Sequence, residues 1–234
     1  MTLNDSPSAF SRIGIVSGVP DELSAFRPDL PRDDVASGAL AVQRIRLGDR
    51  DLFLACAGIG KVAAATAAAS LHAAFGVELL MVIGTAAKIG ALEGHVFNIT
   101  EAFQGDFGAQ RAEGLVHYTA GSWPIGEADV QAFTALRVPG LDLPVARIAT
   151  SDLFIEHAPH AAGLAERLGV HLIDMETAAV AQTAAILGLP WLAIKATTDA
   201  ADESSATAFV DNLHSAAAAS ARAAERAISR LRPA

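Results

Sequence analysis

Carboxylates stand directly after several apolar segments of this sequence, at positions where they could perform acid–base chemistry. Asp174 and Glu176 follow the run HLI. Asp199 closes the run PWLAIKATT, and Glu22 comes shortly after IGIVSGV. An acid kept protonated in an apolar cleft can donate a proton, whereas an ionised one can bind hydroxyl groups or activate water. Each acid taken alone is explained more simply as a helix cap or a turn residue.

The segments around these acids alternate between strand-like and helix-like patterns. Continuous apolar runs predict buried strands, which span residues 13–19, 78–87 and 190–199. The turn GDR joins a predicted hairpin, and alanine-rich segments after Gly60 and Glu176 predict helices. This alternation predicts a single-domain three-layer α/β/α fold with a mixed, largely parallel central sheet. The segment from Gly105 to Gly126 is rich in glycine and is expected to be irregular.

Two glycine turns lie at junctions between these segments. Gly58-Ile-Gly60 follows a strand and opens a helix, as in the dinucleotide-binding fingerprint. It is not in the first strand–helix unit, and the candidate ribose acid, Glu78, precedes its strand, so a tight turn is the favoured interpretation. The turn GTAAKIG, residues 84–90, ends a buried strand and offers backbone N–H groups and the Thr85 hydroxyl. Because ligands of α/β sheets collect at strand ends, these turns and the acids together predict one crevice.

The composition excludes several classes of protein. The net charge of −9 argues against a nucleic-acid partner, because an acidic surface does not neutralise phosphates. Hydrophobic residues make up 52% of the 234 residues, but no segment looks membrane-spanning. An apolar composition without a membrane segment favours an oligomer with an apolar interface.

Two features of the sequence favour a cytoplasmic location, namely its single cysteine and its N-terminal segment. Cys56 alone excludes an internal disulfide and a cysteine-based metal site, and it suits the reducing cytoplasm. The N-terminal sequence MTLNDSPSAFSR lacks the pattern of a secretory signal. We expect residues 1–11 to form a loosely ordered tail and residues 12–234 to form one domain.

The order of the motifs resembles the nucleoside phosphorylase/nucleosidase superfamily. The motifs are IGIVSGVPDE, AGIGKV, GTAA, SDLFI, DMETAAVA and KATTDAAD, and the resemblance covers residues 13–230. Within the superfamily the sequence looks most like the 5′-methylthioadenosine/S-adenosylhomocysteine nucleosidases. This resemblance implies cleavage of the N-glycosidic bond of a purine nucleoside, without a metal or an organic cofactor, and it implies a homodimer.

The resemblance also implies roles for individual residues. Asp199, beside Thr198, would protonate N7 of the departing purine, and Glu22 would orient or deprotonate the attacking water. Glu176 would bind the 2′ and 3′ hydroxyls of the ribose, and Met175 would lie behind the sugar. The remaining assignments are substrate contacts: Phe154 would stack on the base, the Ile155 backbone would contact the purine edge, and Thr85, Ala86 and Ala87 would line the floor of the pocket. Asp174 is left as a cap for the helix that follows.

The nucleophile is inferred from a departure from the family pattern. Phosphorylases of this superfamily hold phosphate with arginines, and the corresponding stretches here, GVPDE and MVIGT, contain none. An anion without guanidinium partners and facing Glu22 would be poorly bound, which favours water. Lys88 and Lys195 could still supply positive charge, so a phosphorylase stays an alternative. Ala87 and Gly105 replace a usual glycine and histidine, which leaves a non-catalytic nucleoside-binding protein as a second alternative.

The 5′ substituent of the nucleoside stays open at this point. Methylthioadenosine, adenosylhomocysteine, 5′-deoxyadenosine, futalosine and other purine nucleosides are all compatible with the motifs. The segment from Gly105 to Gly126 and the residues around His157 would shape this side of the pocket, and their sequence does not select among these substrates.

Overall fold

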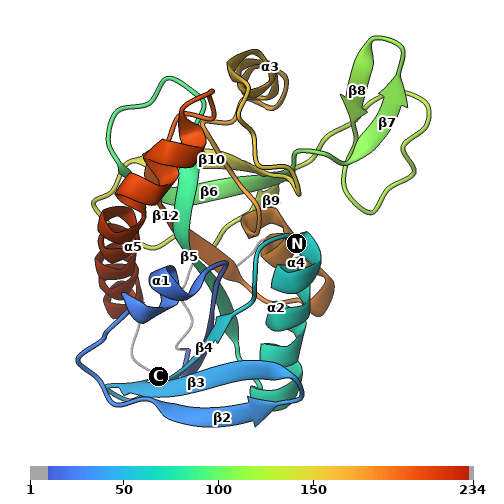
Figure 1. Cartoon of the computed structure of the whole chain (residues 1–234). Coiled ribbons are helices and arrows are strands. Elements are labelled where there is room, and N and C mark those ends of the chain that lie inside the picture. The colour runs from blue at the N-terminus through green and yellow to red at the C-terminus, as the bar shows by residue number, and fades with distance from the viewer. Residues whose placement is uncertain (1–9, 232–234) are drawn as a thin grey trace.

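A computed structural model describes residues 10–231 of the chain, and its strands are the framework of the molecule (Figure 1). The strands of the main sheet are β1 Arg12–Ser17, β2 Asp33–Ser37, β3 Leu40–Leu47, β4 Arg50–Cys56, β5 Leu79–Lys88, β6 Val96–Gln104, β9 Phe133–Thr134, β10 Val145–Thr150, β11 Leu172–Asp174 and β12 Trp191–Asp199. A separate hairpin consists of β7 Gly108–Arg111 and β8 Gly114–His117. The helices are α1 Pro20–Ser24, α2 Lys61–Phe75, α3 Ala158–Leu168, α4 Thr177–Leu187 and α5 Ser205–Arg230.

The main sheet curls so that five of its strands close into a ring. Its order is β11-β10-β6-β12-β5-β1-β4-β3-β2, with β9 beside β6, and β11 also pairs with β5. β5 is parallel to β1 and β12 but antiparallel to β11, so the sheet is mixed. The closure places Asp199 of β12 and Ile173 of β11 on either side of Ala87. Segments that lie far apart in the sequence therefore meet where β5 and β12 end.

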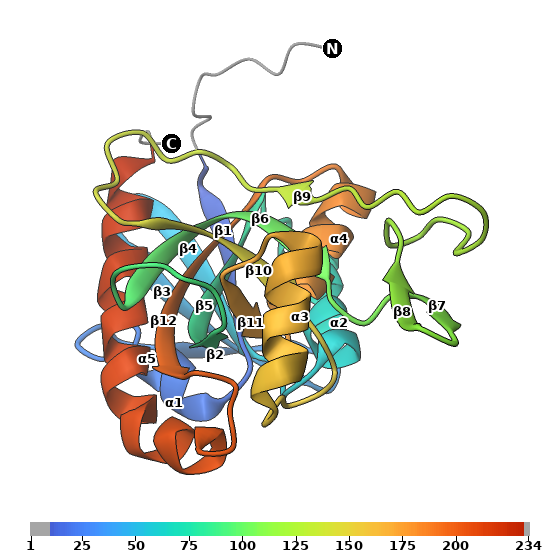
Figure 2. The same cartoon turned by 90° about the horizontal axis from the view of Figure 1, so that it is seen from above.

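Helices cover both faces of this sheet, as Figure 2 shows from above. α2 and α4 pack together on one face, and α1 and α5 on the other. Along β5 the side chains alternate between the two cores, because successive residues of a strand point to opposite faces. Leu80 and Val82 enter the core under α2 and α4, whereas Met81 and Ile83 enter the core under α5. The predicted three-layer α/β/α fold is confirmed.

Most of the predicted elements are present. The hairpin around GDR is formed by β3 and β4, and α2 ends at Gly76, whose φ of 62° is the left-handed conformation that favours glycine. The expectation of an irregular segment from Gly105 to Gly126 is wrong in part, because β7 and β8 pair within it and project from the body (Figure 1). Strands of four residues, partly exposed on both sides, leave no periodic pattern in a sequence.

The structure describes only the last two residues of the predicted N-terminal tail, which spans residues 1–11. Residues 1–9 of this tail lie outside the described part of the chain. Of its last two residues, Phe10 is buried and Ser11 donates to the Glu78 carboxylate. No helix within residues 10–231 is long and apolar enough to cross a membrane.

We expect Arg50→Met to lower the free energy of unfolding by about 2–3 kcal/mol, because hydrogen bonds from a charged donor to buried carbonyls are lost. The buried Arg50 guanidinium donates to the carbonyls of Phe10, Ile228 and Leu231 at 3.1, 2.8 and 2.9 Å, and so joins the end of α5 to the sheet. Urea denaturation measures the change. Arg46→Met, at a side chain that is 73% exposed, is the matched control and should change stability little.

Candidate active site

A pocket of about 710 Å³, partly open to solvent, lies at the meeting point of β1, β5, β11 and β12. Its walls consist of Gly18, Val19, Glu22, Ile59, Thr85, Ala86, Ala87, Leu153, Phe154, Ile155, Ile173, Asp174, Met175, Glu176, Thr198, Asp199 and Phe209. All ten residues selected from the sequence are among them. Most of its surface is apolar, with a few acids among the lining residues, as is usual for small-molecule sites.

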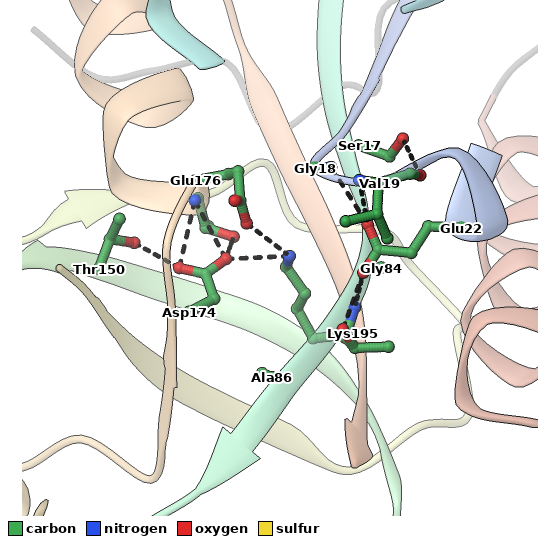
Figure 3. A network of polar contacts seen from close by, with 12 residues as sticks. Ser17, Gly18, Val19, Glu22, Gly84, Ala86, Thr150, Asp174, Glu176 and Lys195 are labelled. Carbon is green, nitrogen blue, oxygen red and sulfur yellow. Dashed lines mark hydrogen bonds and ion pairs between the residues drawn. The ribbon is translucent and has the colours of Figure 1, made fainter. Parts of the chain in front are cut away.

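The Glu22 carboxyl group accepts two hydrogen bonds at each of its oxygens. Oε1 accepts from the Thr85 N–H at 2.7 Å and from the Thr85 hydroxyl at 2.8 Å. Oε2 accepts from the N–H groups of Gly18 and Val19 at 3.1 and 3.3 Å, as Figure 3 shows. The short helix α1 turns the side chain back toward β5, and Glu22 is only 4% exposed. Four donors to one carboxyl group fix its orientation.

Gly84 makes room for this carboxyl group, so we expect Gly84→Ala to slow a reaction that depends on the position of Glu22 by roughly 100-fold, the cost of a displacement of about 1 Å. A Cβ at Gly84 would lie 2.5 Å from the Glu22 carboxyl group, and the φ of +140° already disfavours other residues. The rate with saturating substrate measures the effect. Gly48→Ala is the matched control, since Gly48 also has a positive φ but nothing lies within 4 Å of its added Cβ. It should cost about 1 kcal/mol of stability and leave the rate unchanged.

Glu176 enters the pocket from the start of α4 and is 7% exposed. Its Oε1 accepts from the Gly60 N–H at 3.3 Å, and its Oε2 lies 3.9 Å from the Lys195 Nζ. A Cβ at Gly18 would lie 2.8 Å from Oε1, so that glycine is required for the close approach of β1. Burial raises the pKa of Glu176 to about 7, Lys195 opposes the rise, and the charges of Asp174 and Glu22 add to it.

Asp199 is the last residue of β12 and lines the pocket. Its Oδ2 accepts from the Thr198 hydroxyl at 2.8 Å, and its Oδ1 accepts from the Ala201 N–H at 3.0 Å. The Asn212 side chain donates to the Thr198 carbonyl at 2.9 Å and ties this turn to α5. These contacts hold the carboxyl group at the wall of the pocket, where a bound molecule could exchange a proton with it.

Aromatic side chains form one wall of the pocket. Phe154 packs edge-to-face against Phe209 of α5, with ring centroids 6.1 Å apart, and is 48% exposed. Ile155, next in the chain, is buried. Sequence reasoning missed Phe209 and Ile59. The first lies on the phenylalanine-containing helix after KATTDAAD, and the second lies within the glycine turn, so both were close to motifs already noted.

The two lysines considered as sources of positive charge do not line the pocket. Lys195 is completely buried behind the wall, and its Nζ lies 2.9 Å from Asp174 Oδ2. Lys88 Nζ donates to the carbonyls of Leu92 and Gly94 and lines a separate groove. Asp174 accepts from the Thr177 N–H, so the predicted cap is confirmed.

The turn at Gly60 is not a phosphate-binding loop. The N–H groups of Gly60 and Lys61 at the start of α2 donate to the carboxylates of Glu176 and Asp152. Backbone donors already bound to acids do not face a pyrophosphate, so the tight-turn interpretation is confirmed.

Comparison with known proteins identifies the family. The sequence model of the Phosphorylase superfamily matches residues 12–229, so the chain belongs to this superfamily. It is 26% identical over 220 residues to the 5′-methylthioadenosine/S-adenosylhomocysteine nucleosidase of an Exiguobacterium species, covering 90% of this chain and 94% of that protein. It is 28% identical over 250 aligned positions to the nucleosidase of the same name from Mycobacterium bovis, with 90% and 94% covered.

A solved structure agrees with these sequence relationships. The 5′-methylthioadenosine/S-adenosylhomocysteine nucleosidase of Neisseria meningitidis, in complex with methylthio-immucillin-A, superposes with a TM-score of 0.80 at 25% identity. The alignment covers 94% of this chain and 100% of that one. The resemblance predicted from the motifs is therefore confirmed for the family and for the fold.

Proposed function

We propose that this protein hydrolyses the N-glycosidic bond of a purine nucleoside of the 5′-methylthioadenosine/S-adenosylhomocysteine type and releases adenine. The observation that carries the proposal is one pocket in which Glu22, Glu176 and Asp199 converge from three separate segments. Its relatives from Exiguobacterium and Mycobacterium bovis carry the nucleosidase name over nearly the whole chain.

The proposed reaction divides the chemistry among the three acids. Water attacks C1′ of the ribose while the bond from C1′ to N9 breaks, and positive charge develops on the sugar. Asp199 donates a proton to N7, so that the base leaves as neutral adenine. Glu22 accepts the proton of the attacking water, and Glu176 accepts hydrogen bonds from the ribose hydroxyls and stabilises the cationic ring. Atoms and charge balance without a metal or an organic cofactor.

The charge of the pocket supports water as the nucleophile in place of phosphate. Within residues 10–231, no arginine or lysine lines the pocket. Lys195 is committed to Asp174, and Lys88 to backbone carbonyls. A phosphate beside Glu22 would meet a second acid, without any guanidinium to offset the repulsion between them.

Base release in phosphate-free buffer tests the proposal. We expect adenine from methylthioadenosine at the same rate with and without phosphate, and a free 5-substituted ribose as the second product. A strict requirement for phosphate and a ribose 1-phosphate product would establish the phosphorylase instead. Nucleoside binding without any base release would establish the non-catalytic alternative. Parallel assays with adenosylhomocysteine, 5′-deoxyadenosine and futalosine determine the 5′ substituent.

We also propose that the protein is a cytoplasmic homodimer that associates through an exposed apolar face. This face consists of Ile59, Val62, Trp123, Ile125 and Ile186, which are 61 to 83% exposed. α2 and α4 pack together, and the loop at Gly121 lies against Gln182 of α4, so the three segments are contiguous. Side chains this apolar are seldom left in water together, and a second copy would cover them.

Sedimentation velocity tests the homodimer. The double variant Val62→Glu/Ile186→Glu should sediment as a monomer, because two charges per copy would be desolvated in the interface. Val210→Glu, at an equally apolar exposed position on α5, is the matched control and should leave the dimer intact. A wild type that sediments as a monomer at micromolar concentration would contradict the proposal.

A further inference from the structure

A buried ion pair lies directly behind Glu176. Lys195 Nζ and Asp174 Oδ2 are 2.9 Å apart, and both side chains are 1% exposed (Figure 3). Lys195 belongs to β12 and Asp174 to β11, strands that the closed ring brings to the same place. The roles proposed above use neither residue. A buried pair is not needed for stability, since apolar residues of similar volume stabilise as well, so its position beside an acid of the site calls for another explanation.

Asp174 is fixed by further donors and cannot move away from its partner. Thr150 Oγ1 donates to it at 2.6 Å, and both the N–H and the hydroxyl of Thr177 donate to it as well. These contacts hold the carboxyl group in one orientation. The fixed anion in turn fixes the ammonium group of Lys195, which lies 3.9 Å from Glu176 Oε2 and so outside hydrogen-bond distance. Glu176 therefore experiences the positive charge, while its Oε2 accepts no hydrogen bond from the lysine.

The charged groups around Glu176 come from three different elements. Lys195 of β12 favours its ionised form, whereas Asp174 of β11 and Glu22 of α1 favour its neutral form. The Gly60 N–H, at the start of α2, also favours the ionised form. Burial together with these charges raises the pKa of Glu176 to about 7, so small changes in this surrounding charge alter its ionisation near neutral pH.

We propose that Lys195 and Asp174 are positioning residues that set the charge of Glu176 in opposite directions: Lys195 keeps Glu176 ionised, and Asp174 holds the lysine away from the oxygens that bind the ribose. This inference rests on the proposed function, because it gives Glu176 its ribose-binding role. Without Lys195, burial beside two other acids would leave Glu176 protonated and unable to accept from both hydroxyls. Without Asp174, the ammonium group would be free to bind Glu176 directly.

The pH dependence of kcat/KM for base release tests the inference, because this profile reports ionisations of the free enzyme. In the wild type the acid limb should lie near pH 7. Lys195→Met should move this limb to higher pH, and Asp174→Asn should move it to lower pH, each by about 1 unit or more for a charge within 4–6 Å. The double variant removes both charges and should return the limb close to its wild-type position. Lys195→Arg keeps the charge and should keep the limb.

A purely structural ion pair would give a different result. It would predict that both single variants lose stability and that the acid limb of kcat/KM stays in place. That outcome overturns the inference, and so does an acid limb that moves in the same direction in both single variants. If Lys195→Met does not fold, Asp174→Asn and the double variant carry the test, because the double variant leaves no unpaired buried charge.

A binding measurement separates this inference from the proposed function. Calorimetric titration with a C-nucleoside analogue of adenosine, which has no N-glycosidic bond, reports ribose binding without turnover. In each variant, the affinity for the analogue should begin to fall at the same pH as the acid limb of kcat/KM. A wild type that releases no base would overturn the proposed function alone, whereas an affinity whose pH dependence is identical in all variants would overturn the inference.

Discussion

Asp199→Asn should lower the rate of base release by about 10²- to 10⁴-fold, the usual contribution of a positioned general acid. The amide has nearly the same shape, and its oxygen can still accept from the Ala201 N–H, so the turn after β12 should persist. It has no acidic proton for N7 of the purine, and the base would have to leave as an anion. Steady-state assays with methylthioadenosine give kcat, and calorimetry on the same variant should show that nucleoside binding is retained.

Two controls identify the lost step as proton donation. Asp202→Asn changes a carboxylate three residues away that accepts from Ser204 and does not line the pocket, so its rate should equal that of the wild type. A riboside with a nitrophenolate leaving group needs no proton, so Asp199→Asn should cleave it nearly as fast as the wild type does. A variant that releases adenine within ten-fold of the wild-type rate would show that Asp199 is not the acid.

The positions of the site residues were predictable where each lies at the end of an apolar strand. Glu22 follows β1, Thr85 lies in the second half of β5, and Asp199 ends β12. Parallel neighbouring strands place such ends at one edge of the sheet. The position of Glu176 does not follow from this argument, because β11 runs antiparallel to β5. The DMETAAVA motif located it by resemblance, whereas strand periodicity alone would not have brought it to the same pocket.

The environment of Glu176 could not be read from the sequence, because it depends on closure of the ring. Lys195 and Asp174 stand 21 positions apart, and the lysine lies within an otherwise apolar strand. Only the additional pairing of β11 with β5 brings the acid to the lysine. The requirement for glycine at Gly18 and Gly84 has the same origin, since each contacts a carboxylate from another segment. Contacts of this kind follow from tertiary structure and leave no local pattern.

Glu176→Gln should reduce kcat/KM for methylthioadenosine by about 100-fold or more, because one preorganised electrostatic contact to the transition state is commonly worth 10²–10³. Glutamine can accept from one hydroxyl through its carbonyl oxygen but carries no charge to stabilise the cationic ribose. Its Oε1 can keep the contact with the Gly60 N–H, so the pocket should keep its shape. Wild-type base release from this variant would exclude Glu176 from the ribose site.

The same variant should be more stable than the wild type at alkaline pH. The pKa of Glu176 is raised from 4.5 to about 7 in the folded protein, chiefly by burial, so the folded state binds more protons than the unfolded state between these values. Stability therefore falls as the pH rises through this range, and above pH 7 the whole cost of the buried charge is present. Glutamine removes that cost, which gives a gain of about 2–3 kcal/mol at pH 8 and almost none at pH 4.5.

Urea denaturation at both pH values measures this gain in the free energy of unfolding, with the exposed Glu203→Gln as the matched control. A gain that is equal at the two pH values would mean that the charge of the carboxylate is not its source. A gain confined to the higher pH would show that the ionised Glu176 lowers the free energy of unfolding, so that the charge of this pocket has a cost in stability.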